Sequence, residues 1–170
     1  MGAKAQGADA QRYQIIPRVL VFVTNRSGRV LLLQGAADKK IWAGLWNGIG
    51  GHVEAGETVL DAARRELAEE AGLSCSKWLF CGQVLIELNS GPGIGIFVFR
   101  ASGISGEMTA SEEGNLAWFD LDEALKINLV EDLPTLLPLV LRHKASQPPF
   151  WARYQYDDLD QLVISFSPSA

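Results

Sequence analysis

The chain has little of what marks a secreted, membrane-inserted or nucleic-acid-binding protein. It contains only two cysteines, Cys75 and Cys81, without metal-ligand spacing, so we expect reduced thiols and no disulfide. The small, polar first dozen residues lack the apolar core of a signal peptide, and the apolar helical segment 133–143 is too short to span a bilayer. A net charge of -5 disfavours binding to a nucleic-acid polymer or an acidic membrane surface.

From these features we expect a cytoplasmic protein that is a monomer or a homodimer. Residues 1–12 are interpreted as a disordered lead and residues 13–170 as a single domain, because no internal repeat or long linker divides them. Apolar runs between turn residues predict strands that alternate with helices, which favours an α/β fold with a mixed sheet between helices. The predicted strands are 18–24, 30–34, 78–88, 94–100, 116–119, 151–156 and 162–166.

The segment 51–73 carries most of the chemistry in the sequence. Its residues 59–71 contain no glycine or proline and predict a helix, with Thr58 or Glu57 at its start and Gly72 at its end. Helical spacing then places Glu66, Glu69 and Glu70 on one face.

Two interpretations of this acidic face compete. Three neighbouring carboxylates on a helix are usually only solvated surface, and their repulsion is tolerable there. An apolar stripe beside them indicates instead that the face borders a buried surface, and nearby glycines free the backbone to approach a ligand. Carboxylates beside exposed carbonyls suit Mg²⁺, which commonly brings substrate phosphates with it. The stripe is Val59, Leu60, Ala63, Leu67 and Ala71, and the glycines are Gly48, Gly50, Gly51 and Gly56.

The same segment resembles the signature of the Nudix hydrolases. The pattern is filled by Gly51, Glu57, Arg65, Glu66, Leu67, Glu69, Glu70, Gly72 and Leu73. The resemblance implies an αβα sandwich and a site for Mg²⁺, with Mn²⁺ as a substitute, held by Glu66, Glu69, Glu70 and the carbonyl of Gly50. It makes Gly51, Glu57 and Gly72 structural, and we expect Arg65 to pair with Glu57 and fix the loop against the helix.

Further similarity, to the MutT-like branch that hydrolyses oxidised purine nucleoside triphosphates, implies positions for substrate binding. Asn47 stands where relatives read the base, Glu113 where they keep an additional metal ligand, and Glu131 and Asp132 where an acidic pair contacts the purine. Ile86 and Leu88 replace aromatic pocket residues, which predicts an aliphatic base pocket. His52 replaces a common lysine, so phosphate contacts pass to Lys39 and Lys40, although loop lysines are more often only solvated charge.

The resemblance thus predicts a small-molecule nucleotide substrate. We expect hydrolysis of a purine nucleoside triphosphate, such as 8-oxo-dGTP, to the monophosphate and pyrophosphate, with Glu66 as the base and Glu113 as the runner-up. Two alternatives stay open. One is hydrolysis of ADP-ribose or a dinucleoside polyphosphate, and the other is a regulatory module that binds a nucleotide without turnover.

Overall fold

The computed structural model describes residues 7, 12–37, 41–109 and 114–167. The predicted lead, residues 1–12, lies outside this part of the chain except at positions 7 and 12. The helices are α1 (Val59–Ala71), α2 (Leu121–Ala124) and α3 (Leu133–Arg142). The strands are β1 (Ile15–Thr24), β2 (Val30–Gly35), β3 (Trp46–Asn47), β4 (Leu73–Ile86), β5 (Gly93–Gly106), β6 (Gly114–Phe119), β7 (Phe150–Tyr156) and β8 (Leu162–Phe166).

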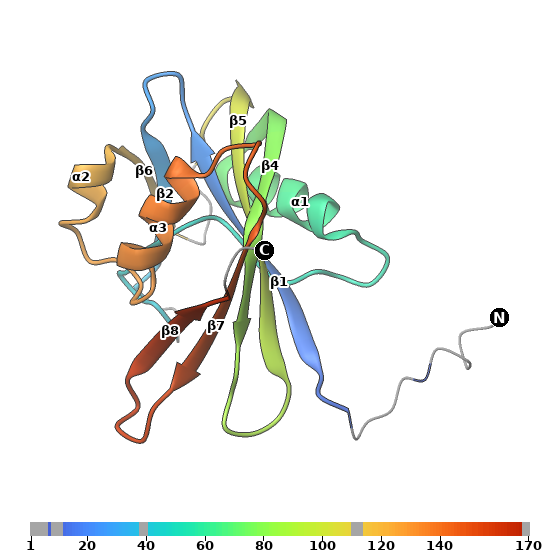
Figure 1. Ribbon diagram of the computed structural model, residues 1–170. Helices are drawn as coiled ribbons and strands as arrows, with labels where there is room; N and C mark the ends of the chain where they lie inside the picture. The colour runs from blue at the N-terminus through green and yellow to red at the C-terminus, as the bar shows by residue number, and fades with distance from the viewer. Residues whose placement is uncertain (1–6, 8–11, 38–40, 110–113, 168–170) are drawn as a thin grey trace.

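The strands form one mixed sheet, as the sequence predicted. Their order is β3-β2-β1-β5-β4-β7-β8, and β6 also pairs with β2. Strand β1 runs parallel to β5, and β4 runs parallel to β7, while the hairpin pairs β1–β2, β4–β5 and β7–β8 are antiparallel. Helix α1 lies on one side of this sheet, and α2 and α3 lie on the other (Figure 1).

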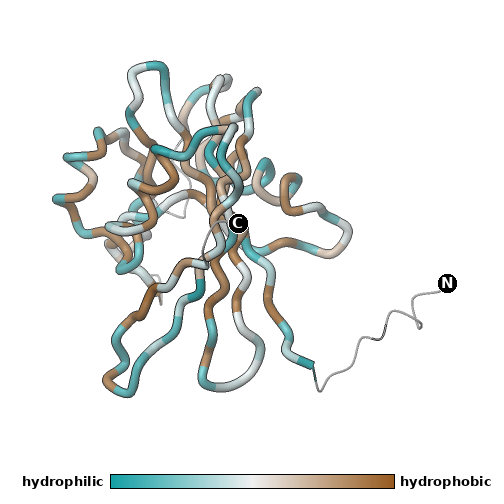
Figure 2. Tube along the Cα trace, in the orientation of Figure 1, coloured by the Kyte–Doolittle hydropathy of each residue, from teal (hydrophilic) through white to brown (hydrophobic). Residues whose placement is uncertain are grey.

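The central strand β1 explains why its sequence is apolar without interruption. Its side chains alternate between two buried cores, one on each face of the sheet, so both sets are covered. Leu20 and Phe22 pack in the core under α3, whereas Val19, Val21 and Val23 pack in the core under α1. Hydrophobic residues accordingly concentrate in the strands and in α3, and hydrophilic residues at many of the turns (Figure 2).

Most predicted elements are confirmed, and the differences have physical reasons. The helix 59–71 forms as expected, the predicted strands 18–24 and 30–34 pair as one antiparallel hairpin, and 78–88 and 94–100 pair as another. The predicted strand 94–100 is longer in the structure, because residues 101–106 continue β5 by pairing with the extended start of β4. Residues 46–47 form the short strand β3 against β2, which is too brief to leave a periodic signal.

Two smaller expectations concern the cysteines and the membrane. Cys75 and Cys81 are free thiols, and burial raises the pKa of each to about 11. Over the residues the structure describes, no helix is long and apolar enough to cross a membrane.

Candidate functional site

Helix α1 is fixed at both ends by its own sequence. The backbone N–H of Asp61 donates to Thr58 Oγ1 (3.2 Å), and the N–H of Thr58 donates to Asp61 Oδ2 (3.2 Å). At the other end Gly72 adopts a φ of 67°, the left-handed conformation that ends helices, and its N–H donates to the carbonyl of Ala68. The caps thus fix the first and last residues of the helix that carries the carboxylates.

Arg65 ties the loop before the helix to the helix itself. Its Nε donates to Glu57 Oε1 (2.7 Å) and its Nη2 to Glu57 Oε2 (3.1 Å), so the predicted pair is confirmed and is bidentate. Nη2 also donates to the carbonyl of His52 (2.9 Å). The guanidinium holds the pKa of Glu57 below its ordinary 4.5, and the carboxylates raise the pKa of Arg65.

The three carboxylates share a helix face, but they do not converge. Glu66 and Glu69 both accept from Arg65 Nη1, at 2.8 and 3.0 Å. Glu70, only 7% exposed, accepts a hydrogen bond from the N–H of Gly50 at 3.2 Å. Within the described part of the chain, no three acidic, histidine or cysteine side chains lie close enough together to hold a metal ion. The predicted acidic trio is therefore divided, because like charges repel and Arg65 attracts two of the three.

The glycine loop packs too closely to accept side chains. The N–H of Val19 donates to the Gly51 carbonyl (2.9 Å) and that of Val21 to the Ile49 carbonyl (2.7 Å), which joins the loop to β1. A Cβ on Gly51 would lie 2.2 Å from Glu66 Oε1, and one on Gly50 would lie 2.1 Å from the carbonyl oxygen of Val19. A side chain at Gly50 would clash with fixed backbone, whereas one at Gly51 would displace the carboxylate of Glu66. Glycine at both positions lets the loop lie directly against β1 and this carboxylate.

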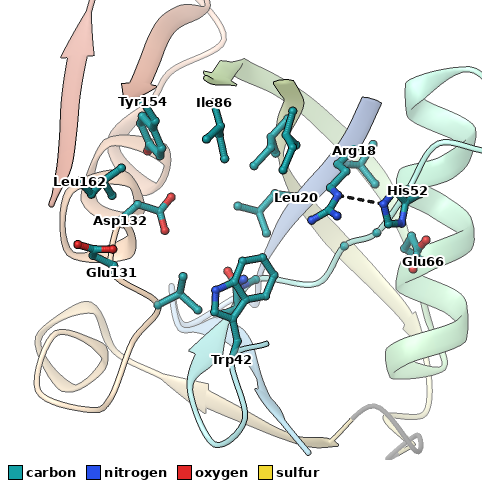
Figure 3. A pocket seen from close by; sticks show the side chains of 18 of the residues that line it. Arg18, Leu20, Trp42, His52, Glu66, Ile86, Glu131, Asp132, Tyr154 and Leu162 are labelled. Atoms are coloured by element: carbon teal, nitrogen blue, oxygen red, sulfur yellow. Dashed lines mark hydrogen bonds between the residues drawn. The ribbon is translucent and has the colours of Figure 1, made fainter. Parts of the chain in front are cut away.

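A cavity of about 510 Å³ runs from this loop toward the C-terminal strands, and its volume suits a nucleotide-sized ligand (Figure 3). Carboxylates lie at both ends, with Glu66 at one end and Glu131 and Asp132 at the other. Glu70 also lines the cavity and bonds to Gly50 of the glycine loop. Apolar side chains line the middle. The apolar and aromatic lining consists of Val19, Leu20, Trp42, Ile86, Leu88, Ile94, Ile96, Val130, Tyr154, Tyr156 and Leu162.

The structure brings most of the predicted site residues to this one cavity. They are Asn47, Gly50, Gly51, His52, Glu66, Glu70, Ile86, Leu88, Glu131 and Asp132. Glu57, Arg65, Glu69 and Gly72 are not part of the lining and support the helix and its loop. Lys39, Lys40 and Glu113 lie outside the described residues.

Several lining residues were missed by sequence reasoning. Tyr154 and Tyr156 of β7 face the cavity, and their spacing of two on a predicted strand was the available signal. Trp42 also lines it, whereas Trp46 is a core residue whose ring packs edge-on against Phe119 at 4.9 Å. The aliphatic pocket expected from Ile86 and Leu88 is thus corrected to an aliphatic pocket with aromatic walls contributed by other elements.

The far end of the cavity holds a half-buried carboxyl, Asp132, and a buried hydroxyl, Tyr154. Burial raises the pKa of the Asp132 carboxyl. Tyr154 is 2% exposed, and its hydroxyl has no well-aligned hydrogen-bond partner among the described residues, although the carboxyl of Asp132 lies close enough to interact with it. Burial, and after it the nearby charge of Asp132, raises the pKa of the Tyr154 hydroxyl. Asp132 and Tyr154 can therefore form hydrogen bonds with a ligand at this end of the cavity, where little water reaches them.

Comparisons with known proteins agree with the geometry. The NUDIX domain family matches residues 15–140. Oxidized purine nucleoside triphosphate hydrolase of Mus musculus is 36% identical over 140 residues, covering 82% of this chain and 85% of that protein. The protein of the same name from Danio rerio is 38% identical over 137 residues, covering 80% and 84%.

A solved structure shares the fold over nearly its whole length. The MutT protein from Bacillus halodurans superposes with a TM-score of 0.75 at 25% identity, covering 92% of this chain and 100% of that one. The match of the family over most of the chain, together with the filled signature on α1, leads to one conclusion. The chain belongs to the Nudix hydrolase family.

Proposed function

We propose that the protein hydrolyses oxidised purine nucleoside triphosphates, of the 8-oxo-dGTP kind, to the nucleoside monophosphate and pyrophosphate with Mg²⁺. The observation that carries the proposal is the single cavity that joins the carboxylates of α1 to a base-sized apolar section ending in Glu131 and Asp132. The two relatives named as oxidised purine nucleoside triphosphate hydrolases, at 36% and 38% identity, support this substrate class.

The donor chemistry at α1 fits a divalent ion. Glu66, Glu69, Glu70 and the Gly50 carbonyl supply only oxygen, the ligand that hard cations prefer. Glu69 would have to leave Arg65, but its side chain is 60% exposed, and such ion pairs hold their partners weakly. Glu57 keeps two hydrogen bonds to Arg65 when Glu69 turns. When bound, Mg²⁺ or Mn²⁺ neutralises phosphate charge and lowers the pKa of a water for attack at phosphorus.

The protein's own residues then divide the remaining work. Glu66, 13% exposed and held by Arg65 at the edge of the cavity, is the proposed base that takes the proton of the attacking water. Glu113, the runner-up and an additional ligand, lies outside the described residues. Arg65 acts as a positioning residue, because it touches Glu66, Glu69 and the loop carbonyl of His52.

The opposite end of the cavity would recognise the base. Asp132 and Glu131 present carboxyl groups to the amide and amine edges of a purine, and Asn47 presents a side-chain amide. Trp42, Ile86 and Leu162 offer apolar surface to the ring faces. Loss of any polar member should weaken discrimination between bases more than it weakens hydrolysis in general.

A substrate panel with product identification tests the proposal. We expect Mg²⁺-dependent release of pyrophosphate from oxidised purine nucleoside triphosphates, at a higher kcat/KM than from the canonical ones. ADP-ribose and dinucleoside polyphosphates belong in the same panel. Faster turnover of either would overturn the substrate assignment, and nucleotide binding without any turnover would show a regulatory module instead.

Matched variants test the metal ligands. Glu69→Gln and Glu70→Gln should each lower kcat by at least about a hundredfold at saturating Mg²⁺ with little change in melting temperature, since each loses a metal ligand but keeps its shape. Glu123→Gln, a carboxylate on α2 away from the cavity, is the control and should keep the parent rate. Parent-like turnover by both α1 variants would contradict the ligand assignment.

A further inference from the structure

The cavity is strongly acidic for a site that takes a polyphosphate. Its described lining contains the carboxylates Glu54, Glu66, Glu70, Glu131 and Asp132, and a single arginine, Arg18. A polyanion entering this lining meets net negative charge unless cations offset it. A metal ion at α1 would neutralise only the phosphates at that end of the cavity. Any other phosphate needs a second cation in the lining, and Arg18 is the arginine in the described lining.

Arg18 lies at the boundary between the two halves of the cavity. The N–H of Val19 donates to Gly51 (2.9 Å), and the N–H of Val53 donates to Pro17 (3.1 Å), so the backbone on either side of Arg18 is bound to the glycine loop. Figure 3 shows Arg18 between the apolar side chain of Leu20 and the pair His52 and Glu66 near α1. A nucleotide with its base against the apolar walls and its scissile phosphate at Glu66 and Glu70 must pass its phosphate chain beside Arg18.

The guanidinium of Arg18 is oriented by a hydrogen bond to His52, and no acidic side chain among the described residues pairs with it. Its Nε donates to His52 Nε2 at 3.1 Å, so the ring of His52 accepts one hydrogen bond from the guanidinium. No carboxylate within the described residues forms an ion pair with Arg18, in contrast to Arg65, Arg29 and Arg153, which all have acidic partners. The edge formed by Nη1 and Nη2 keeps its full charge and its fork of N–H donors, which matches phosphate in a bidentate manner.

We propose that Arg18, held by His52, is a phosphate-binding residue that receives the nucleotide's phosphate chain between the base and the metal end of the cavity. The proposal rests on the proposed function and deepens it. In this arrangement His52 is a positioning residue that fixes the plane of the guanidinium. The charge that binds phosphate is then carried by strand β1, and the loop contributes the ring that orients it.

Steady-state kinetics and calorimetry on single variants test this role. Arg18→Ala should raise KM for the nucleoside triphosphate by roughly 10- to 100-fold, the usual effect of losing charge-assisted hydrogen bonds, with a smaller effect on kcat. The same variant should bind inorganic pyrophosphate and a non-hydrolysable nucleoside triphosphate more weakly. Arg18→Lys should recover part of the affinity, because it restores the charge but not the fork. Arg26→Ala, an exposed arginine in the β1–β2 turn and away from this cavity, is the matched control.

His52 adds a double-mutant cycle. His52→Ala should raise KM less than Arg18→Ala, and the double variant should resemble Arg18→Ala alone, because His52 acts through Arg18. Additive effects would contradict that positioning role.

The outcomes separate the two proposals. If the parent hydrolyses no nucleoside triphosphate, the proposed function fails, yet pyrophosphate affinity still tests Arg18. If the parent is active and Arg18→Ala keeps both its KM and its affinity for pyrophosphate, the role of Arg18 is wrong. Weaker binding of the nucleotide with unchanged binding of pyrophosphate would assign Arg18 to the nucleoside instead and would also overturn the proposal. A melting temperature equal to the parent's excludes misfolding as the cause.

Discussion

Polar side chains inside the cavity differ in whether the protein itself supplies their hydrogen-bond partners. Glu70 accepts from a backbone N–H, and Glu66 accepts from Arg65, so their carboxylates are held before any ligand arrives. The hydroxyl of Tyr154 is as deeply buried, but it has no well-aligned hydrogen bond among the described residues and only the nearby carboxyl of Asp132 to interact with. A buried hydroxyl without a partner destabilises the fold, which makes Tyr154 a sensitive probe of ligand contact.

Tyr154→Phe is the corresponding prediction at this scale. Removal of the unsatisfied hydroxyl should leave the free energy of unfolding unchanged or raise it by up to about 1 kcal/mol, because a desolvated group without a partner disappears. Thermal or denaturant unfolding of the ligand-free protein measures this. A clear loss of stability would mean that the hydroxyl is hydrogen-bonded in the folded protein, with the nearby Asp132 as its partner.

Helix α1, the glycine loop 48–52 and strand β1 work as one unit. The loop is bound to β1 by backbone hydrogen bonds and to the helix by Arg65. Gly50 lets the loop lie against the backbone of β1, and Gly51 leaves room for the carboxylate of Glu66 from α1. The rotation of α1 and the position of Glu66 therefore depend on a backbone contact as much as on the helix's own sequence.

Gly51→Ala tests this close contact. The added methyl would fall 2.2 Å from Glu66 Oε1, so the carboxylate must move away from its place at the cavity edge. We expect kcat to fall by roughly tenfold or more, with a modest loss of stability.

Gly91→Ala in the β4–β5 turn is the control, because its methyl meets nothing within 4 Å although φ is 80°. It should lose some stability through backbone strain but keep the parent rate. Equal rates for the two variants would show that Glu66 adjusts freely.

At the scale of the whole molecule, partnered carboxyl groups link folding to pH. Hydrogen bonds lower the pKa of four carboxyl groups. Arginines are the donors for two of them, Arg65 for Glu57 and Arg153 for Glu87. Thr58 is the donor for Asp61, and the N–H of Asp120 is the donor for Glu123. Their ordinary values are 3.8 for Asp61 and 4.5 for the three glutamates. The folded protein thus binds fewer protons than the unfolded chain near these values. The contribution of these groups to the free energy of unfolding is complete above their ordinary pKa values. It is lost as the pH falls through their lowered pKa values in the folded protein.

We therefore expect the melting temperature to fall as pH drops from about 6 to 3, because these four groups outweigh Asp132, whose raised pKa acts in the opposite direction. Glu87→Gln, which removes one of the four and lies away from α1, should flatten the acid side of the curve. Differential scanning calorimetry across this pH range makes the measurement. A melting temperature that holds steady or rises on acidification would contradict the assignment of the linked groups.

The local elements and the signature could be predicted from the chain because their causes are local. The caps of α1, the turn residues between strands and the doubly apolar β1 depend on neighbouring residues and on periodicity. The filled pattern from Gly51 to Leu73 also indicated the family and the pairing of Arg65 with Glu57. The end of β5 was less predictable, since a polar segment became a strand only through pairing with β4.

The composition of the cavity was decided by the tertiary structure. Arg18, Trp42, Tyr154 and Leu162 come from segments far apart in sequence, and only the pairing of β7 with β4 and of the loop with β1 brings them together. The division of the acidic trio was hidden for the same reason. Helical spacing places Glu66, Glu69 and Glu70 on one face, but the charge of Arg65 and the N–H of Gly50 decide which way each carboxylate turns. Periodicity fixes the face on which a side chain lies, whereas its partners across the fold fix what it can bind.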